Sequence, residues 1–161
     1  MPSPSPGYTV CSTTAVIAAT AQTVINLISA TNDMPIITEI GVGFDGTAAS
    51  APALVELLLS SQAGAGTPGS SPAPQLIRGF VSGGSAAQST AGISYSAEPT
   101  VLTLAKQWLV TPTGGQLIVQ FPLGREPSGI TSGGSGAGKA YALRITSPKA
   151  CNCRAYMEFE E

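Results

Sequence analysis

Ionisable side chains are scarce in this 161-residue chain. Charged residues make up 10% of it, histidine does not occur, and the formal net charge is −2 at pH 7. Ordinary soluble domains carry about 25% charged residues. Without histidine, a Ser-His-Asp or Cys-His catalytic arrangement cannot form and the commonest metal ligand is missing. The basic residues are scattered singly, with no stripe that could neutralise phosphates, so we expect no nucleic-acid partner.

Long apolar runs are also missing. No run reaches the roughly 18 residues that cross a bilayer, so we expect no membrane partner. The opening Met1–Gly7 is rich in Pro and Ser and lacks the basic and apolar regions of a signal peptide, which argues against secretion by that route. Three cysteines, Cys11, Cys151 and Cys153, are too few for a disulfide scaffold. We expect buried free thiols, with a link from Cys11 to the C-terminal pair as the alternative if the terminal strands are neighbours.

Short apolar runs separated by Gly, Pro and Ser turns fill most of the chain. Apolar residues make up 43% of it, and there are 19 Gly and 13 Pro. This pattern predicts an all-β protein, a jelly-roll-like antiparallel β-sandwich of about eight strands. We expect an extended N-terminal arm over residues 1–10, either disordered or lying across a neighbouring subunit, and a single sandwich domain over residues 11–161.

The segment Ala97–Pro127 is expected to be the scaffold of this domain. It contains two expected strands, Val101–Val110 and Gln116–Phe121, joined by the turn Thr111–Gly115. Pro112 fixes φ for a turn and the paired glycines allow positive φ, so the sequence predicts a hairpin. Apolar residues alternate along the second strand, as expected for a strand with one face on a core.

Other strands follow from similar patterns. They are expected over Tyr8–Cys11 (a short edge strand), Thr23–Ser29, Pro35–Phe44, Ala53–Ser60, Leu76–Val81 (weak or irregular), and a second hairpin of Ala140–Thr146 and Cys151–Phe159. For Ala53–Ser60 a helix competes, but the segment is short for one. The alternate glycines Gly41 and Gly43 suggest a close approach of another backbone, or a bend.

Candidate chemical sites are weak. Glu98 and Glu126 each precede a Pro at a strand end, where we expect turn capping or pairing with Arg125 rather than acid–base catalysis. Gly133–Ala140 resembles a phosphate-binding loop, but Ala140 replaces the required hydroxyl and an extended segment follows. Cys151 and Cys153 share a strand face, so we expect them side by side in the core rather than on zinc.

Aromatic and acidic clusters give two further candidates. Trp108, Tyr95, Tyr141 and Tyr156 could form a sugar-binding platform, although core packing is favoured for most of them. The acidic C-terminus, with Glu158, Glu160 and Glu161, is expected to be a solvated end, or else to dock a basic partner. We therefore assign no catalytic, cofactor-binding or metal residue, and we expect a protein that is not an enzyme.

Several motifs resemble small β-rich virion proteins of tailed bacteriophages. They are SAEPT at Ser96–Thr100, the turn at Thr111–Gly115, QFPLGREP at Gln120–Pro127, VGFDG at Val42–Gly46 with VEL at Val55–Leu57, and RAYMEFEE at Arg154–Glu161. The matches run from about Val24 to the C-terminus. The resemblance implies a capsid decoration (cement) protein, synthesised in the host cytoplasm, that binds the major capsid protein on the outside of the virion as a homotrimer.

The expected function is therefore non-enzymatic. The chain would stabilise a tailed-phage capsid by bridging major capsid subunits, with contacts made by the Met1–Val10 arm and the loops Ser61–Pro74 and Ser128–Gly138. Several modest contacts from one oligomer would add up to a stable brace. The alternatives are a phage tail or fibre component, or a carbohydrate-binding β-sandwich for host attachment.

Overall fold

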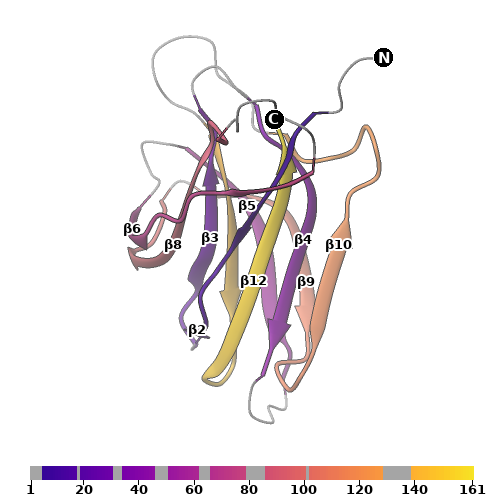
Figure 1. Ribbon diagram of the computed structural model, residues 1–161. Helices are drawn as coiled ribbons and strands as arrows, with labels where there is room; N and C mark the ends of the chain where they lie inside the picture. The colour runs from indigo at the N-terminus through magenta and orange to yellow at the C-terminus, as the bar shows by residue number, and fades with distance from the viewer. Residues whose placement is uncertain are drawn as a thin grey trace.

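The computed structural model describes residues 5–17, 19–30, 34–45, 51–61, 66–78, 86–100, 102–128 and 139–161. These residues form two antiparallel sheets that face each other across one core (Figure 1). The all-β, two-sheet sandwich expected from the sequence is confirmed. The described residues hold twelve strands rather than eight, because short strands border the long ones.

The first sheet, sheet A, contains in spatial order β10 (Gln116–Gln120), β4 (Ile36–Phe44), β12 (Cys151–Glu160), β1 (Gly7–Cys11) and β7 (Gln75–Arg78), with β2 (Ala15–Ile17) also paired to β12. The second, sheet B, contains β6 (Thr67–Ser70), β8 (Thr90–Ala97), β3 (Gln22–Ile28), β11 (Lys139–Thr146), β5 (Ala53–Ser61) and β9 (Leu102–Val110). Both lateral sides of the sandwich therefore end in one strand of each sheet.

The hairpin expected over the central segment is wrong, although both of its strands exist. β9 pairs with β5 in sheet B, whereas β10 pairs with β4 in sheet A. The connection Thr111–Gly115 closes on itself, with the Gly115 amide donating to the Thr111 carbonyl over 3.1 Å. Stacked sheets lie about 10 Å apart, and a connection of this length can cross that gap. The two strands thereby pair with nine-residue partners in different sheets.

The expected C-terminal hairpin is wrong for the same reason. β11 lies between β3 and β5 in sheet B, and β12 lies between β4 and β1 in sheet A. The strands β1, β12, β4 and β10 of sheet A thus lie in the same lateral order as β3, β11, β5 and β9 of sheet B. Along the chain, most long strands lie in the other sheet from the long strand before them. We interpret this winding as jelly-roll-like.

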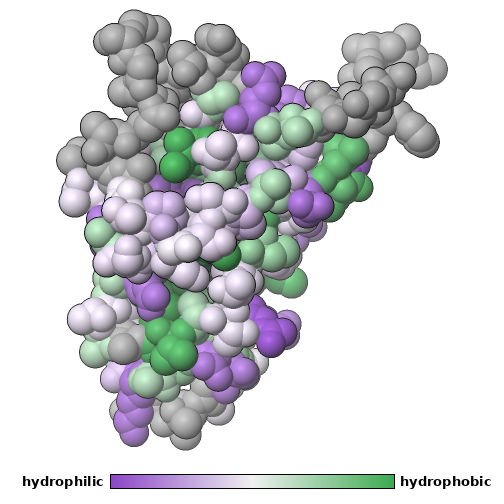
Figure 2. Space-filling view, turned by 60° about the vertical axis from the view of Figure 1, so that its left-hand side comes forward, coloured by the Kyte–Doolittle hydropathy of each residue, from purple (hydrophilic) through white to green (hydrophobic). Residues whose placement is uncertain are grey.

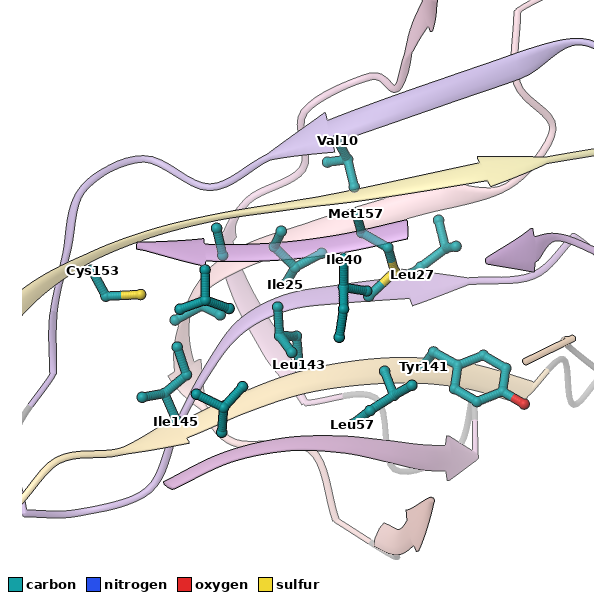
Figure 3. Close-up of a cluster of buried hydrophobic side chains, with 14 of the residues drawn as sticks. Val10, Ile25, Leu27, Ile40, Leu57, Tyr141, Leu143, Ile145, Cys153 and Met157 are labelled. Carbon is teal, nitrogen blue, oxygen red and sulfur yellow. The ribbon is translucent and has the colours of Figure 1, made fainter. Parts of the chain in front are cut away.

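Alternating side chains build the core. Along β12, Cys151, Cys153, Ala155, Met157 and Phe159 are buried and the intervening residues are more exposed, as the sequence predicts. Figure 3 shows Met157 and Ile40 of sheet A among Leu143, Ile25 and Leu57 of sheet B. The expected strand at β5 is confirmed over the competing helix.

β1 is not the edge strand that we expected. It lies between β12 and β7, and Tyr8 stacks on Phe159 with ring centroids 5.6 Å apart. The expected boundary between arm and domain, after residue 10, falls inside β1. Residues 1–4 lie outside the described residues.

Strands β6, β7 and β8 cover one lateral side of the sandwich. The expected loop Ser61–Pro74 is wrong over Thr67–Ser70, because these residues form β6 against β8. The weak strand expected over Leu76–Val81 is present as β7, which pairs with β1, and residues 79–81 lie outside the described residues.

The acidic C-terminus fastens this cover and is not a solvated end. The Glu161 carboxylate accepts hydrogen bonds from the Gln88 amide over 2.6 Å, and from the Ser89 amide and hydroxyl over 3.1 and 2.8 Å. Glu160 forms an ion pair with Arg78 of β7. The last residues of the chain therefore hold the segment before β8 and the strand β7 onto the sandwich.

Candidate functional site

A groove runs along the outer face of sheet A, over β4 and between β10 and β12. Gly41 and Gly43 form its floor, because alternate residues of a strand share a face. One part, of about 470 Å³, lies beside Tyr156 and Ile118, and a second part, of about 370 Å³, continues to Asp45. Both parts are lined by Gly43, Gln116 and Arg154, so they form one continuous hollow.

The two glycines have different surroundings. A Cβ atom built on Gly41 would lie 2.0 Å from the Tyr156 ring, whereas a Cβ on Gly43 would have no atom within 4 Å. The expected close approach at Gly41 is therefore made by the ring of its cross-strand partner, Tyr156, and not by another backbone. Gly43 leaves the groove open.

The Tyr156 ring is held by a carboxylate. Its hydroxyl donates to Glu39 Oε1, while Gln120 Nε2 donates to Glu39 Oε2 over 2.8 Å. Burial, followed by the hydrogen bond to Glu39 and its negative charge, raises the pKa of Tyr156 to about 12. The phenol therefore keeps its proton at neutral pH and remains a donor to Glu39.

Two carboxylates lie side by side next to Tyr156, outside the lining of the groove. Glu39 of β4 and Glu158 of β12 are direct cross-strand partners. Burial, and then the charge of Glu39, raise the pKa of Glu158, while Arg78 acts in the opposite direction. Cross-strand like charges are destabilising. Among the described residues no group of three or more His, Cys, Asp or Glu side chains could hold a metal ion, so this pair is not part of a metal cluster.

Exposed aliphatic side chains flank the side of the sandwich where β9 and β10 end the two sheets, which we call the open side; those of β9 face outward from sheet B and that of β10 faces outward from sheet A. They are Leu104 (49% exposed) and Leu109 (69%) on β9, Ile118 (62%) on β10 and Leu123 (97%) in the turn after β10. Isolated exposed apolar residues are ordinary. On a chain with so little charge, several along one side make a candidate interaction surface.

The candidate acids Glu98 and Glu126 are bound to different sheets. Glu98 Oε2 accepts from the Thr23 amide of β3 over 2.9 Å, so Glu98 binds a distant strand and does not cap a turn as expected. Glu126 precedes Pro127, whose carbonyl accepts from the Ile37 amide of β4. The pairing with Arg125 is not seen: the ion pairs among the described residues join Arg78 with Glu160 and Arg144 with Glu56.

The cysteines are free and are split between core and surface. Cys151 and Cys153 are buried, as expected, but Cys11 is exposed, which corrects that expectation. β1 and β12 are neighbours, yet Cys11 is paired with Tyr156 on the outer face while the other two thiols face the core, so the alternative disulfide is wrong. Burial raises the pKa of Cys153 to about 12, which keeps it a thiol.

The four candidate aromatic residues do not form one platform. Tyr95 and Tyr141 are buried, and the Tyr141 hydroxyl donates to the Ser128 carbonyl over 3.0 Å. Trp108 packs against the core from sheet B, whereas Tyr156 lies on the outer face of sheet A. The sugar-binding surface expected as an alternative is therefore not assembled from these residues.

Most of the other sequence candidates fall outside the described residues. Residues 129–138 include most of the Ser128–Gly138 loop and of the phosphate-loop-like segment; β11 starts at Lys139, so a strand follows this segment as expected. The described residues contain no helix long and apolar enough to cross a membrane.

The sequence signal for the exposed surface of β10 that we missed was Ile118, an apolar residue on the polar face of this strand.

No protein-family model, curated protein or solved structure matches this chain.

Proposed function

We propose that the chain is a non-enzymatic virion protein that decorates a tailed-phage capsid and stabilises it by bridging major capsid subunits. Three features support the proposal: the resemblance of its motifs to small phage virion proteins, its low content of charge, and the open side with its exposed aliphatic residues. The proposed location is the outer surface of the virion.

The observation that carries this proposal is the open side. Leu109 and Leu123 lie largely in water, and a partner that covered either of them fully would gain about 1.5–3 kcal/mol per side chain. Such contacts are individually weak. Several copies that bind neighbouring capsid subunits at once make them strong together, because later contacts form at high effective concentration.

The proposal is tested with heads assembled from the major capsid protein of the same virus and lacking any decoration. The purified chain should co-sediment with these heads, and Leu109→Lys combined with Leu123→Lys should lower occupancy by roughly tenfold or more, because buried unpaired charge is costly. Val16→Lys is the matched control, since Val16 is 63% exposed on β2 and away from the open side. It should leave occupancy unchanged.

Three results would overturn the proposal. They are saturable binding to purified tails but not to heads, binding to glycans but not to heads, and equal occupancy of the control and the doubly substituted chain. The first two would favour a tail component or a host-attachment protein, respectively. Unchanged far-ultraviolet circular dichroism of each variant shows that loss of binding is not loss of folding.

A further inference from the structure

β10 leaves one edge of sheet A unpaired among the described residues. It pairs with β4 on one side, and no other described strand pairs with its far edge (Figure 1, where β10 is the outermost strand on the right). An unpaired edge presents free N–H and C=O groups to any strand of matching register. Natural proteins usually protect such edges by shortness, Pro, inward charge or a bulge.

The other three sheet edges carry these protections. β9 has a register shift that leaves Ala105 as an extra residue, and its Lys106 is paired with core residue Leu57 and reaches inward to within 4.9 Å of the Phe121 ring centre. β6 has four residues, including Pro68, and β7 has four residues, including Arg78. The pairings of β6 and β7 are also shifted.

β10 lacks the Pro, the charge and the register shift found in the other edge strands. Its sequence, Gln116-Leu117-Ile118-Val119-Gln120, contains no Pro and no charge, and it pairs with β4 without a register shift. Ile118, at its centre, is 62% exposed. Of the four strands that end the two sheets in the described part of the chain, β10 alone lacks Pro, charge and a register shift, which favours a partner at this edge.

The backbone groups that face away from β4 can be identified. The Gly115 carbonyl and the Phe121 amide bond to β4. In an antiparallel strand the N–H and C=O of one residue point to the same side, and the side alternates along the strand. The free groups therefore belong to Gln116, Ile118 and Gln120.

These groups are self-complementary. If a second β10 runs antiparallel with Ile118 opposite Ile118, then Gln116 lies opposite Gln120 of the copy, and the free residues form hydrogen-bonded pairs throughout. The same register places Leu117 opposite Val119 on the core-facing side, and it pairs the full length of β10 in both copies. Other registers leave part of each strand unpaired.

We propose that two copies of this chain associate through their β10 edges about a two-fold axis at Ile118, which joins their two A sheets into one. Such an interface uses the same surface on both subunits. The inference does not depend on capsid binding, and it replaces the three-fold association implied by the resemblance with a two-fold one. It leaves Leu109 and Leu123 for a different partner.

A charge placed on the axis tests the proposal. Ile118→Lys sets two ammonium groups opposite each other, and like charges in directly opposite positions are destabilising. In sedimentation equilibrium, the unmodified chain should form a species of twice the 16.1 kDa monomer mass, and Ile118→Lys should raise its dissociation constant by roughly tenfold or more. Leu109→Lys adds the same charge on β9, the edge strand of sheet B on the same side, and should leave the dissociation constant unchanged.

A crosslink tests the register independently of affinity. Residues in a hydrogen-bonded antiparallel pair have Cα atoms about 5.5 Å apart, within the range that a disulfide spans. In a Cys11→Ser background, Ile118→Cys should give a disulfide-linked dimer on mild oxidation, and Leu109→Cys should not. A trimer, a monomer at about 100 µM, or a dimer unaffected by Ile118→Lys and not crosslinked through position 118 would overturn the proposal.

Discussion

The two lateral sides of the sandwich end differently. On the side of β1 and β3, the chain adds β6, β7 and β8. Glu161 binds the segment that precedes β8, and Glu160 forms an ion pair with β7. Figure 2 brings the β6 and β8 side forward and shows mostly pale and purple surface with small separate green patches. On the open side, β9 and β10 end the sheets with Leu109 and Ile118 more than 60% exposed, whereas Leu76 and Ile77 of β7 on the other side are 43% and 50% exposed.

The two sides differ in how far strands of the same chain cover the core. The strands β6, β7 and β8, which lie between β5 and β9 along the chain, close one side. Nothing comparable in the described residues closes the other side. This difference is the reason for placing both proposed contacts, with the capsid and with a second copy, on the open side.

The largest expected effect is on the free energy of unfolding, when one isoleucine from each side is replaced by alanine. Ile93 of β8 is 3% exposed and Ile118 of β10 is 62% exposed. Ile93→Ala should lower the free energy of unfolding by about 2–5 kcal/mol, because it leaves a cavity. Ile118→Ala should change it by about 0.5 kcal/mol or less, as at most surface sites. Urea denaturation at a protein concentration low enough to give monomers measures both.

The comparison of the two sides would fail if these substitutions had similar costs. A large cost at Ile118 in the monomer would mean that residues of the same chain cover β10. A small cost at Ile93 would mean that β8 is an appendage rather than part of the core.

Strand positions could be predicted from the sequence, because they depend on local patterns. The alternation along β12 and the apolar run of β5 set which residues face the core whatever the partner strand. Pairing partners could not be predicted in the same way. The turn Thr111–Gly115 has the residues of a hairpin, but its length also allows the chain to cross to the other sheet, and only the competition among all strands decides between the two.

The candidate site was predictable only in part. Alternate glycines at Gly41 and Gly43 signal a close approach, but which residue makes the approach depends on the register between β4 and β12. The role of Glu161 was hidden because its partner, Ser89, lies 72 residues away along the chain. The exposure of Ile118 became informative only once β10 was known to end a sheet.

A smaller effect is expected for two glycines of β4, which is the neighbour of β10. The Tyr156 ring covers Gly41, whereas Gly43 has open space beside it. Gly41→Ala should lower the free energy of unfolding by about 1–3 kcal/mol, because its new methyl group would overlap the Tyr156 ring. Gly43→Ala should raise it by about 0.5–1 kcal/mol, since the space is empty and a strand glycine is entropically costly. Equal effects in thermal and urea unfolding would show that Tyr156 does not rest on Gly41.

The smallest expected effect concerns how Tyr156 is held over Gly41. Its pKa is about 12 in the folded chain and 10.0 in an unperturbed tyrosine. Between pH 10 and pH 12 the unfolded phenol loses its proton while the folded phenol keeps it, so the free energy of unfolding should fall as pH rises through this window. Below pH 10 the full contribution is present.

Tyr156→Phe should remove this part of the alkaline loss and make the stability of the variant less dependent on pH above 10. The pKa values of Tyr95, Tyr141 and Cys153 are also raised by burial, so the difference between the two chains isolates Tyr156 from these groups. Urea denaturation at several pH values between 9 and 12 measures the difference. If both chains lost stability equally, the contact with Glu39 would not favour the protonated Tyr156 phenol in the folded chain.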